Sequence, residues 1–138
     1  MFTTRWNAVC ARRRLVSVEP SCPAFVCHDD GEFRRSLIRA LDQTHFSVTF
    51  VDDEDSALDV LRARGEEFDV ALVSLDLKSN RGVKALEFLR DHHHACGVII
   101  LGEPHSDVRN YATYADETLL KPVDPMYVAT RARTYCNC

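Results

Sequence analysis

Four polar stretches could carry chemistry in this chain, and each follows an apolar run. They are 28–30 (His-Asp-Asp), 74–76 (Ser-Leu-Asp), 102–103 (Gly-Glu) and 121–122 (Lys-Pro). Carboxylate oxygens are the ligands that hard cations such as Mg²⁺ prefer, whereas a serine hydroxyl is a poor nucleophile without an adjacent base. These stretches form one candidate site if the fold brings them together.

The elements that would position these stretches alternate between strand and helix. Apolar or β-branched runs predict strands at 24–27, 46–51, 70–75, 98–101 and 118–120. Amphipathic spacing predicts a helix after each strand, the fourth of them over 106–115. Five β–α units in a row predict an α/β fold, a doubly wound parallel sheet with helices on both faces. In such sheets functional residues gather at the carboxyl ends of the strands.

Several residues have structural roles in the same pattern. Asp30 or a neighbour is expected to cap the first helix, and Arg34 to face water on its outer side. Acids within 52–55 and Asp124 are expected to cap the second and last helices. Gly65 is expected to end the second helix.

Charge divides the chain into a tail and one domain. Residues 1–23 contain Arg5, Arg12, Arg13 and Arg14, with Glu19 as their one acid, while the whole chain has a net charge of −4. We expect 1–23 to be a flexible basic tail, with an organellar transit peptide as an alternative, and 24–138 to be the folded domain. An acidic domain lacks the basic face that nucleic acid requires, and no apolar run is long enough to cross a membrane.

The six cysteines include no C-x-x-C pair. Because the N-terminal residues lack the apolar core of a secretory signal, we expect free thiols in a cytoplasmic protein, with Cys27 buried in the first strand. Soft ligands at 92–96, which include His92, His93 and His94, and at 136–138 could bind zinc. The alternative is a polar loop and a chain end, because the spacing differs from that of a zinc knuckle.

From about residue 24 to 135 the chain resembles the receiver domains of response regulators. The resemblance rests on 25–30, the helix that begins Phe33-Arg34-Arg35, the strand from Asp69 to Ser74, Gly82 and Lys121-Pro122, with matching spacing between them. It implies a flavodoxin-like (βα)5 sheet with strand order 2-1-3-4-5 and a role in two-component or phosphorelay signalling. Members of the family bind Mg²⁺ through acids after the first strand and become phosphorylated on their own aspartate after the third strand. A lysine that precedes a proline after the fifth strand neutralises the phosphoryl oxygens.

The chain departs from the family pattern at four of these positions. Ser74 stands where the phosphorylated aspartate belongs, and His28 replaces one acid. In the family, a hydroxyl residue after the fourth strand and an aromatic residue on the fifth shift when the domain is phosphorylated, and these are its switch residues. Gly102 replaces the switch hydroxyl and Thr118 the switch aromatic. Asp29 and Lys121 are retained, and without its usual partners Lys121 is expected to pair with Asp29. A serine cannot form an acyl phosphate, and the loss of carboxylates weakens Mg²⁺ binding.

The sequence therefore predicts an atypical receiver that acts by phosphorylation-independent protein–protein interaction, without enzymatic activity or cofactor. Its partner would be a histidine kinase, a regulator, an effector or a second copy bound through residues 107–135. Met126, Tyr127, Val128 and Tyr135 indicate a contact surface there, with ordinary packing as the alternative.

Two other interpretations stay open. One is an active receiver that autophosphorylates on a shifted acceptor, Asp76, with Mg²⁺ bound by Asp29, Asp30 and Asp76. Asp76 has a structural alternative as a loop aspartate, and Asp30 as a helix cap. The other interpretation is an unrelated flavodoxin-like binding domain that shares only the architecture; Lys121-Pro122 and the matched spacing argue against it.

Overall fold

Five parallel strands form the centre of the molecule, in the order β2-β1-β3-β4-β5. The structure is a computed structural model that describes residues 21–77, 82–104 and 108–137. The strands are β1 (Cys22–Cys27), β2 (Phe46–Val51), β3 (Val70–Ser74), β4 (Gly97–Gly102) and β5 (Glu117–Leu120). The predicted fold class and strand order are confirmed; the expected tail lies outside the described residues up to residue 20.

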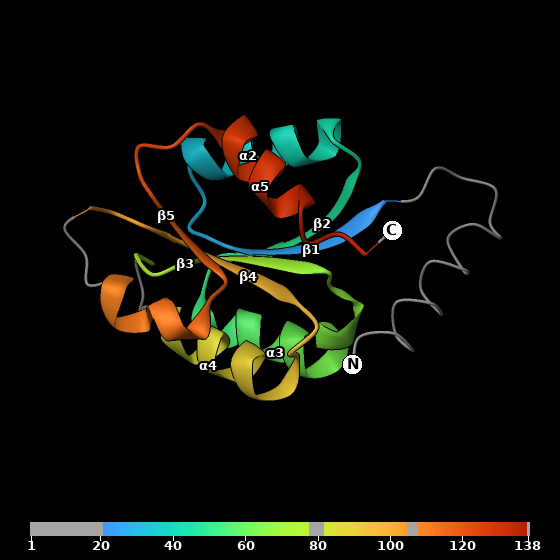
Figure 1. The fold of residues 1–138 in the computed structure, drawn as a ribbon, viewed down its shortest axis with the longest axis vertical. Coiled ribbons are helices and arrows are strands. Elements are labelled where there is room, and N and C mark those ends of the chain that lie inside the picture. Colours follow the sequence, from blue (N-terminus) through green and yellow to red (C-terminus); the bar gives the residue numbers. More distant parts are fainter. Residues whose placement is uncertain (1–20, 78–81, 105–107, 138) are drawn as a thin grey trace, which may run out of the picture.

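Helices cover both faces of the sheet (Figure 1). α2 (Glu32–Gln43) and α5 (Pro125–Arg133) lie on one face, and α3 (Glu54–Arg64) and α4 (Val83–His92) on the other. Two 3₁₀ segments, η1 (Gly65–Glu67) and η2 (Val108–Tyr114), complete the described elements. No helix among the residues described is long and apolar enough to cross a membrane.

The core consists of two layers, because successive side chains of a strand point to opposite faces. In β3, Ala71 and Val73 pack in the layer of α3 and α4, whereas Val70 and Leu72 pack in the layer of α2 and α5. Every residue of β3 is buried, which agrees with its nearly continuous apolar sequence and its central place in a parallel sheet.

Two predicted helix caps are confirmed. The Asp53 carboxylate accepts a hydrogen bond from Ser56 N at 2.7 Å, and that of Asp124 accepts one from Met126 N at 3.0 Å. Each satisfies an N–H group that the first turn of a helix leaves without an internal partner. These caps set where α3 and α5 begin, just after β2 and β5 end.

Two other local expectations are wrong. β1 begins at Cys22 rather than at residue 24, and the segment expected as a fourth α-helix is the 3₁₀ segment η2, whose aromatic and β-branched residues are weak helix formers.

Gly65 is the C-cap of α3, as predicted, although its φ of −55° is not the left-handed conformation common for a glycine cap. A glycine at this position allows close packing, because a Cβ there would lie 2.2 Å from His93 Nε2.

Asp30 itself does not cap α2, and the expectation that Arg34 faces water is wrong. The N-cap of α2 is Gly31, with no side-chain hydrogen bond, and the Asp30 carboxylate instead lies 3.2 Å from Arg34 Nη2. Arg34 is buried rather than facing water, and its Nη1 donates to the carbonyl of His28 at 3.2 Å. The side chain turns inward because both of these acceptors lie at the end of β1.

A disulfide joins Cys22, at the start of β1, to Cys136, just after α5. The expectation that every cysteine is a free thiol is therefore wrong for this pair. Beside the disulfide, the buried carboxylate of Asp69 accepts hydrogen bonds from Asn137 N and Nδ2, at 3.2 and 3.1 Å. Cys27 is a buried thiol, as predicted, and burial, followed by nearby carboxylates, raises its pKa to about 12.

Candidate functional site

The candidate residues lie together at the end of the sheet that is formed by the carboxyl ends of the parallel strands. Leu75 N, just beyond β3, donates to Leu101 O at 3.1 Å, and Lys121 N, just beyond β5, donates to Gly102 O at 2.8 Å. His28 follows β1, which is paired with β3 in the same sheet. We name the group His28, Phe33, Ser74, Asp76 and Lys121 the strand-end site.

The centre of this site is a hydrogen bond between Lys121 Nζ and His28 Nε2, 2.6 Å apart. His28 Nδ1 lies 3.0 Å from the carbonyl of Asp29, so Nδ1 carries the proton and donates to it. Nε2 is then the acceptor of a neutral imidazole, and the lysine ammonium is its donor. The partner expected for Lys121 was Asp29; the structure places His28 there instead.

Burial of the two groups shifts both pKa values downward. The pKa of His28 lies below its usual value chiefly because the ring is buried, and the charges of Lys121 and Arg34 add to this. Burial also lowers the pKa of Lys121, while Glu103, Asp76 and Asp29 oppose the shift. The lowered pKa of His28 favours a neutral imidazole, whose Nε2 can accept the hydrogen bond from Lys121.

Phe33, in the first turn of α2, packs against both members of the pair. The Lys121 ammonium lies 4.7 Å from the centre of the Phe33 ring, and the His28 ring is stacked on it at 5.3 Å. A cation over an aromatic face contributes about 1 kcal/mol when partly desolvated. Sequence reasoning did not assign Phe33 to the site; its position in the first turn of a helix, next to a strand end, was the signal that could have done so.

Ser74 is the last residue of β3 and is 1% exposed. Its hydroxyl oxygen accepts a hydrogen bond from Asp76 N at 3.1 Å, which satisfies that N–H group in the loop beyond the strand. Gly82 passes close to the same residue, since a Cβ on Gly82 would lie 2.5 Å from Ser74 O. Its burial leaves the Ser74 hydroxyl little access to solvent.

The three carboxylates considered for Mg²⁺ are not assembled into a metal site. Asp76 Oδ2 accepts a hydrogen bond from Glu103 N at 2.9 Å, and Asp30 pairs with Arg34 and Arg35. Within the described parts of the chain, no three His, Cys, Asp or Glu side chains are grouped to hold a metal ion. Mg²⁺ requires near-octahedral oxygen ligands, and a neutral imidazole bonded to a lysine does not fit that requirement.

Gly102 and Thr118, the residues assigned to the two switch positions, lie in the neighbouring strands β4 and β5. Gly102 is buried at the end of β4 and pairs in register with Leu120, and Thr118 is half-buried opposite Ile100. Glycine has no side chain that could contact a phosphoryl group or move in response to one. A threonine also lacks the ring of an aromatic switch residue.

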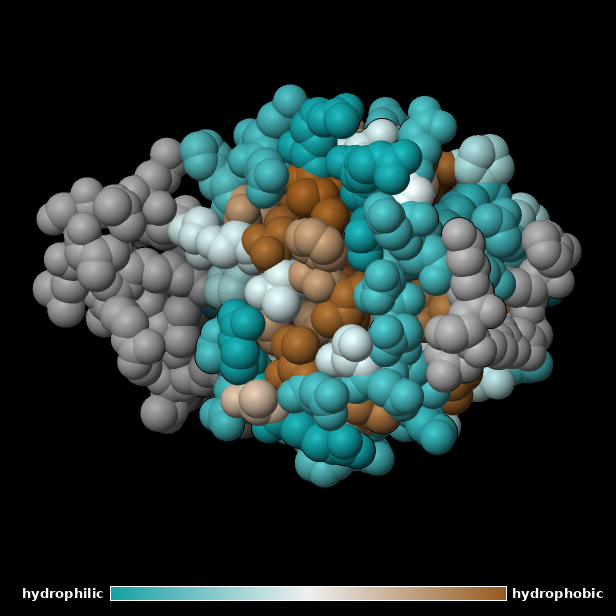
Figure 2. Space-filling model, turned by 180° about the vertical axis from the view of Figure 1, so that it is seen from behind, coloured by the Kyte–Doolittle hydropathy of each residue, from teal (hydrophilic) through white to brown (hydrophobic). Residues whose placement is uncertain are grey.

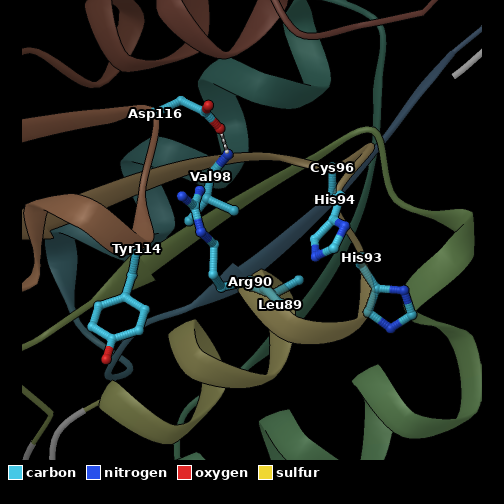
Figure 3. Close-up of a pocket in the computed structure, with 8 residues that line it drawn as sticks. All are labelled: Leu89, Arg90, His93, His94, Cys96, Val98, Tyr114 and Asp116. Carbon is cyan, nitrogen blue, oxygen red and sulfur yellow. Dashed lines mark hydrogen bonds between the residues drawn. The ribbon is translucent and has the colours of Figure 1, made fainter. Parts of the chain in front are cut away.

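The histidines of 92–94 do not converge on a zinc site. His92 Nδ1 lies 3.1 Å from Phe88 O, and the His93 ring packs against Gly65. Figure 3 shows the rings of His93 and His94 directed to different sides, at the margin of a cavity of about 290 Å³ whose lining includes Asp116. Asp116 accepts from Val98 N at 2.8 Å, and Cys136, in its disulfide, has no thiolate to offer.

The expected contact surface near the C-terminus is only partly exposed. Met126 and Tyr127 are 39% and 51% exposed, but Val128 is buried, and Tyr135 donates its hydroxyl hydrogen to Glu117 Oε2 at 2.5 Å. Leu120 at the end of β5, which the sequence did not single out, is 45% exposed. We name Leu120, Met126 and Tyr127 the β5–α5 face.

Comparisons with known proteins agree with this architecture. The family model described as response regulator receiver domain matches residues 24–133. A receiver domain protein from Clostridium thermocellum has a TM-score of 0.73 at 19% identity, covering 84% of this chain and 94% of its own. A sensor protein from Polaromonas sp. JS666 has a TM-score of 0.70 at 20% identity, covering 84% and 96%. At such identities the likeness of these structures concerns the fold; no curated protein matches the chain.

Proposed function

This chain belongs to the response regulator receiver domains, the signalling modules of two-component pathways, and from that premise we propose that it signals without being phosphorylated. It would act as a protein-binding module whose strand-end site has lost phosphoryl transfer. We further propose that it acts in the cytoplasm, where it would bind a histidine kinase, another regulator or an effector.

The observation that carries this proposal is the state of Ser74. It stands at the position of the phosphorylated aspartate, buried and hydrogen-bonded to the backbone of its own loop. A hydroxyl there needs a base to become a nucleophile, and its phosphate ester would lack the lability of an acyl phosphate. The Lys121–His28 hydrogen bond supports the same conclusion, because the ammonium that would meet phosphoryl oxygens already has an acceptor.

The β5–α5 face supports a docking role. Leu120 and Tyr127 expose apolar surface at the edge of the sheet opposite to β2, and Leu120 directly precedes Lys121 of the strand-end site. Exposed apolar surface is typical of protein-interaction sites. A partner at this face would contact the domain next to the site that regulates other receivers.

Intact-mass measurement after incubation with Mg²⁺ and acetyl phosphate tests the proposal. We expect no one-phosphate gain, and we expect beryllofluoride with Mg²⁺ to leave the amide NMR spectrum unchanged. Asp76→Asn is the matched variant, since Asp76 lies close enough to raise the pKa of Lys121 and is the alternative acceptor. A mass gain in the native chain that Asp76→Asn abolishes would establish the alternative and overturn the proposal.

A further inference from the structure

The outer edge of β2 has the features of an interaction surface. Its sequence, FSVTFV, contains no charged residue and no proline, the two devices that commonly protect an exposed edge strand. Phe50 is 49% exposed, and Val48 and Val51 are partly exposed. Figure 2 shows the side of the molecule opposite to that of Figure 1, with a hydrophobic area between hydrophilic borders.

The backbone of β2 also has hydrogen-bonding groups directed away from the sheet. In the register of the β1–β2 pair, His45 O accepts from Cys22 N, and Val51 O accepts from His28 N. Both carbonyls belong to odd-numbered residues, which therefore direct their backbone groups towards β1. Because the backbone groups of successive residues in a strand point to opposite sides, the even-numbered residues Phe46, Val48 and Phe50 direct their N–H and C=O groups away from the sheet. In the part of the chain that the structure describes, β2 pairs only with β1.

From these observations we propose that two copies of this chain pair through β2, antiparallel, about a twofold axis at Val48. The outward backbone groups of Val48 then bond to those of Val48 in the second copy. Phe46 of one copy lies opposite Phe50 of the other, and cross-strand aromatic pairs of this kind stabilise a sheet. The contact uses the same patch twice, so it closes as a dimer.

The charges at the two ends of β2 select this antiparallel orientation. Asp52 and Asp55 are exposed just after the strand. At the other end, Arg133 donates to Thr44 O, and its guanidinium lies 5.7 Å from the Phe46 ring. Antiparallel pairing about Val48 brings Asp52 of one copy opposite Thr44 of the other, beside Arg133; parallel pairing would place the acidic ends together.

The dimer leaves the other side of the domain accessible. β2 and β5 are the two edges of the sheet, so pairing through β2 does not cover the β5–α5 face. The inference does not depend on the proposed function, because it uses no residue of the strand-end site. Each dimer would present two copies of that face to its partners.

Sedimentation equilibrium of the full chain tests the proposal with three variants. Val48→Pro removes the outward N–H at the twofold axis and leaves the N–H groups that bond to β1, a position where edge strands tolerate proline. Phe50→Lys adds a charge to the patch, and Leu120→Lys is the control, at a residue of similar exposure on the β5–α5 face. We expect a dimer for the native chain and Leu120→Lys, and a halved mass for the other two.

Circular dichroism and thermal unfolding show whether each variant is folded. If Val48→Pro fails to fold, Phe50→Lys decides, because half of that side chain already lies in solvent. A native chain that is monomeric at all concentrations would overturn the inference. So would a dimer that Leu120→Lys dissociates and Phe50→Lys does not.

Amide hydrogen exchange at Val48 and Phe50 identifies the occupant of the edge. Protection that rises with protein concentration supports a second copy. Protection that is independent of concentration would mean that a segment of the same chain, such as residues 1–20, pairs with β2, and this would refute the dimer.

Discussion

At the residue scale, His28 determines the role of the lysine that faces it. A carboxylate at that position would attract a metal ion and leave Lys121 to meet an anion. The neutral imidazole instead accepts the ammonium hydrogen at 2.6 Å, over the face of Phe33. The result is a closed contact between three side chains that requires no ligand.

The first prediction concerns acid stability and follows from the lowered pKa of His28. Between its folded pKa and the usual 6.5, the unfolded chain binds more protons than the folded one, so stability rises with pH through this window. We expect stability to be lost as the pH falls below 6.5, because protonation would place a second cation beside Lys121.

Urea unfolding at several pH values between about 5 and 7.5 measures this effect. His28→Gln, which keeps an acceptor but does not titrate, should flatten the pH dependence, whereas His94→Gln, an exposed control, should not. Equal slopes in the native chain and His28→Gln would contradict the prediction.

The second prediction concerns restoring phosphoryl transfer. Ser74→Asp alone should not be phosphorylated by acetyl phosphate, because His28 and its bonded lysine do not bind Mg²⁺. The double variant His28→Asp with Ser74→Asp restores two carboxylates and frees Lys121, so it should gain one phosphate in a Mg²⁺-dependent manner. Intact mass is the measurement; a Ser74→Asp variant that reacts as well as the double variant would show that His28 is not limiting.

At the element scale, the helices are held by caps from neighbouring segments as well as their own. Asp53 caps α3 from the preceding turn, but α4 has no side-chain cap of its own. Glu54, the first residue of α3, is buried and accepts a hydrogen bond from Lys84 N at 2.8 Å. An N–H group in the first turn of α4 is thus satisfied by a side chain of α3, and this hydrogen bond holds the two helices against each other.

The third prediction follows from this cap between helices. Glu54→Ala should lower the free energy of unfolding by about 1–2 kcal/mol, since it removes an N-terminal cap from a partly buried helix end. Asp59→Ala, at an exposed position of the same helix, is the matched control and should change stability little. Urea denaturation of both variants checks the difference, and equal losses would contradict it.

At the scale of the whole molecule, the Cys22–Cys136 disulfide connects both ends of the folded region. The two cysteines are 114 residues apart in the chain, and Asp69 fixes Asn137 beside them. The disulfide and the Asp69 contacts hold the residues after α5 against the start of β1. Disulfides are rare in a reducing cytoplasm, so the redox state of this pair bears on the proposed location.

The fourth prediction is that reduction destabilises the domain. Opening a loop of this length should cost about 4–5 kcal/mol of stability by the loop-entropy estimate. Chemical denaturation with and without a thiol reductant measures the loss, and Cys22→Ala should be less stable and insensitive to the reductant. A native chain whose stability is unchanged by reduction would show that the disulfide contributes nothing.

Local patterns in the sequence were sufficient for the alternation of strands and helices along the chain, the burial of β3 and the caps at Asp53 and Asp124, whereas the spatial order of the strands came from the resemblance to receiver domains. Each of these local features depends on residues a few positions apart, whose periodicity and hydrogen-bonding capacity are properties of the chain itself. The position of Ser74 at the end of β3 belongs to the same group.

Tertiary structure alone decided the contacts between residues far apart in the chain. Lys121 meets His28 across 93 positions and Cys22 meets Cys136 across 114, and no periodic pattern encodes either distance. Arg34 turned inward for the same reason, since its acceptors are set by where β1 ends relative to α2. Such pairings depend on how the elements pack, because only packing determines which polar groups lose water and must find each other.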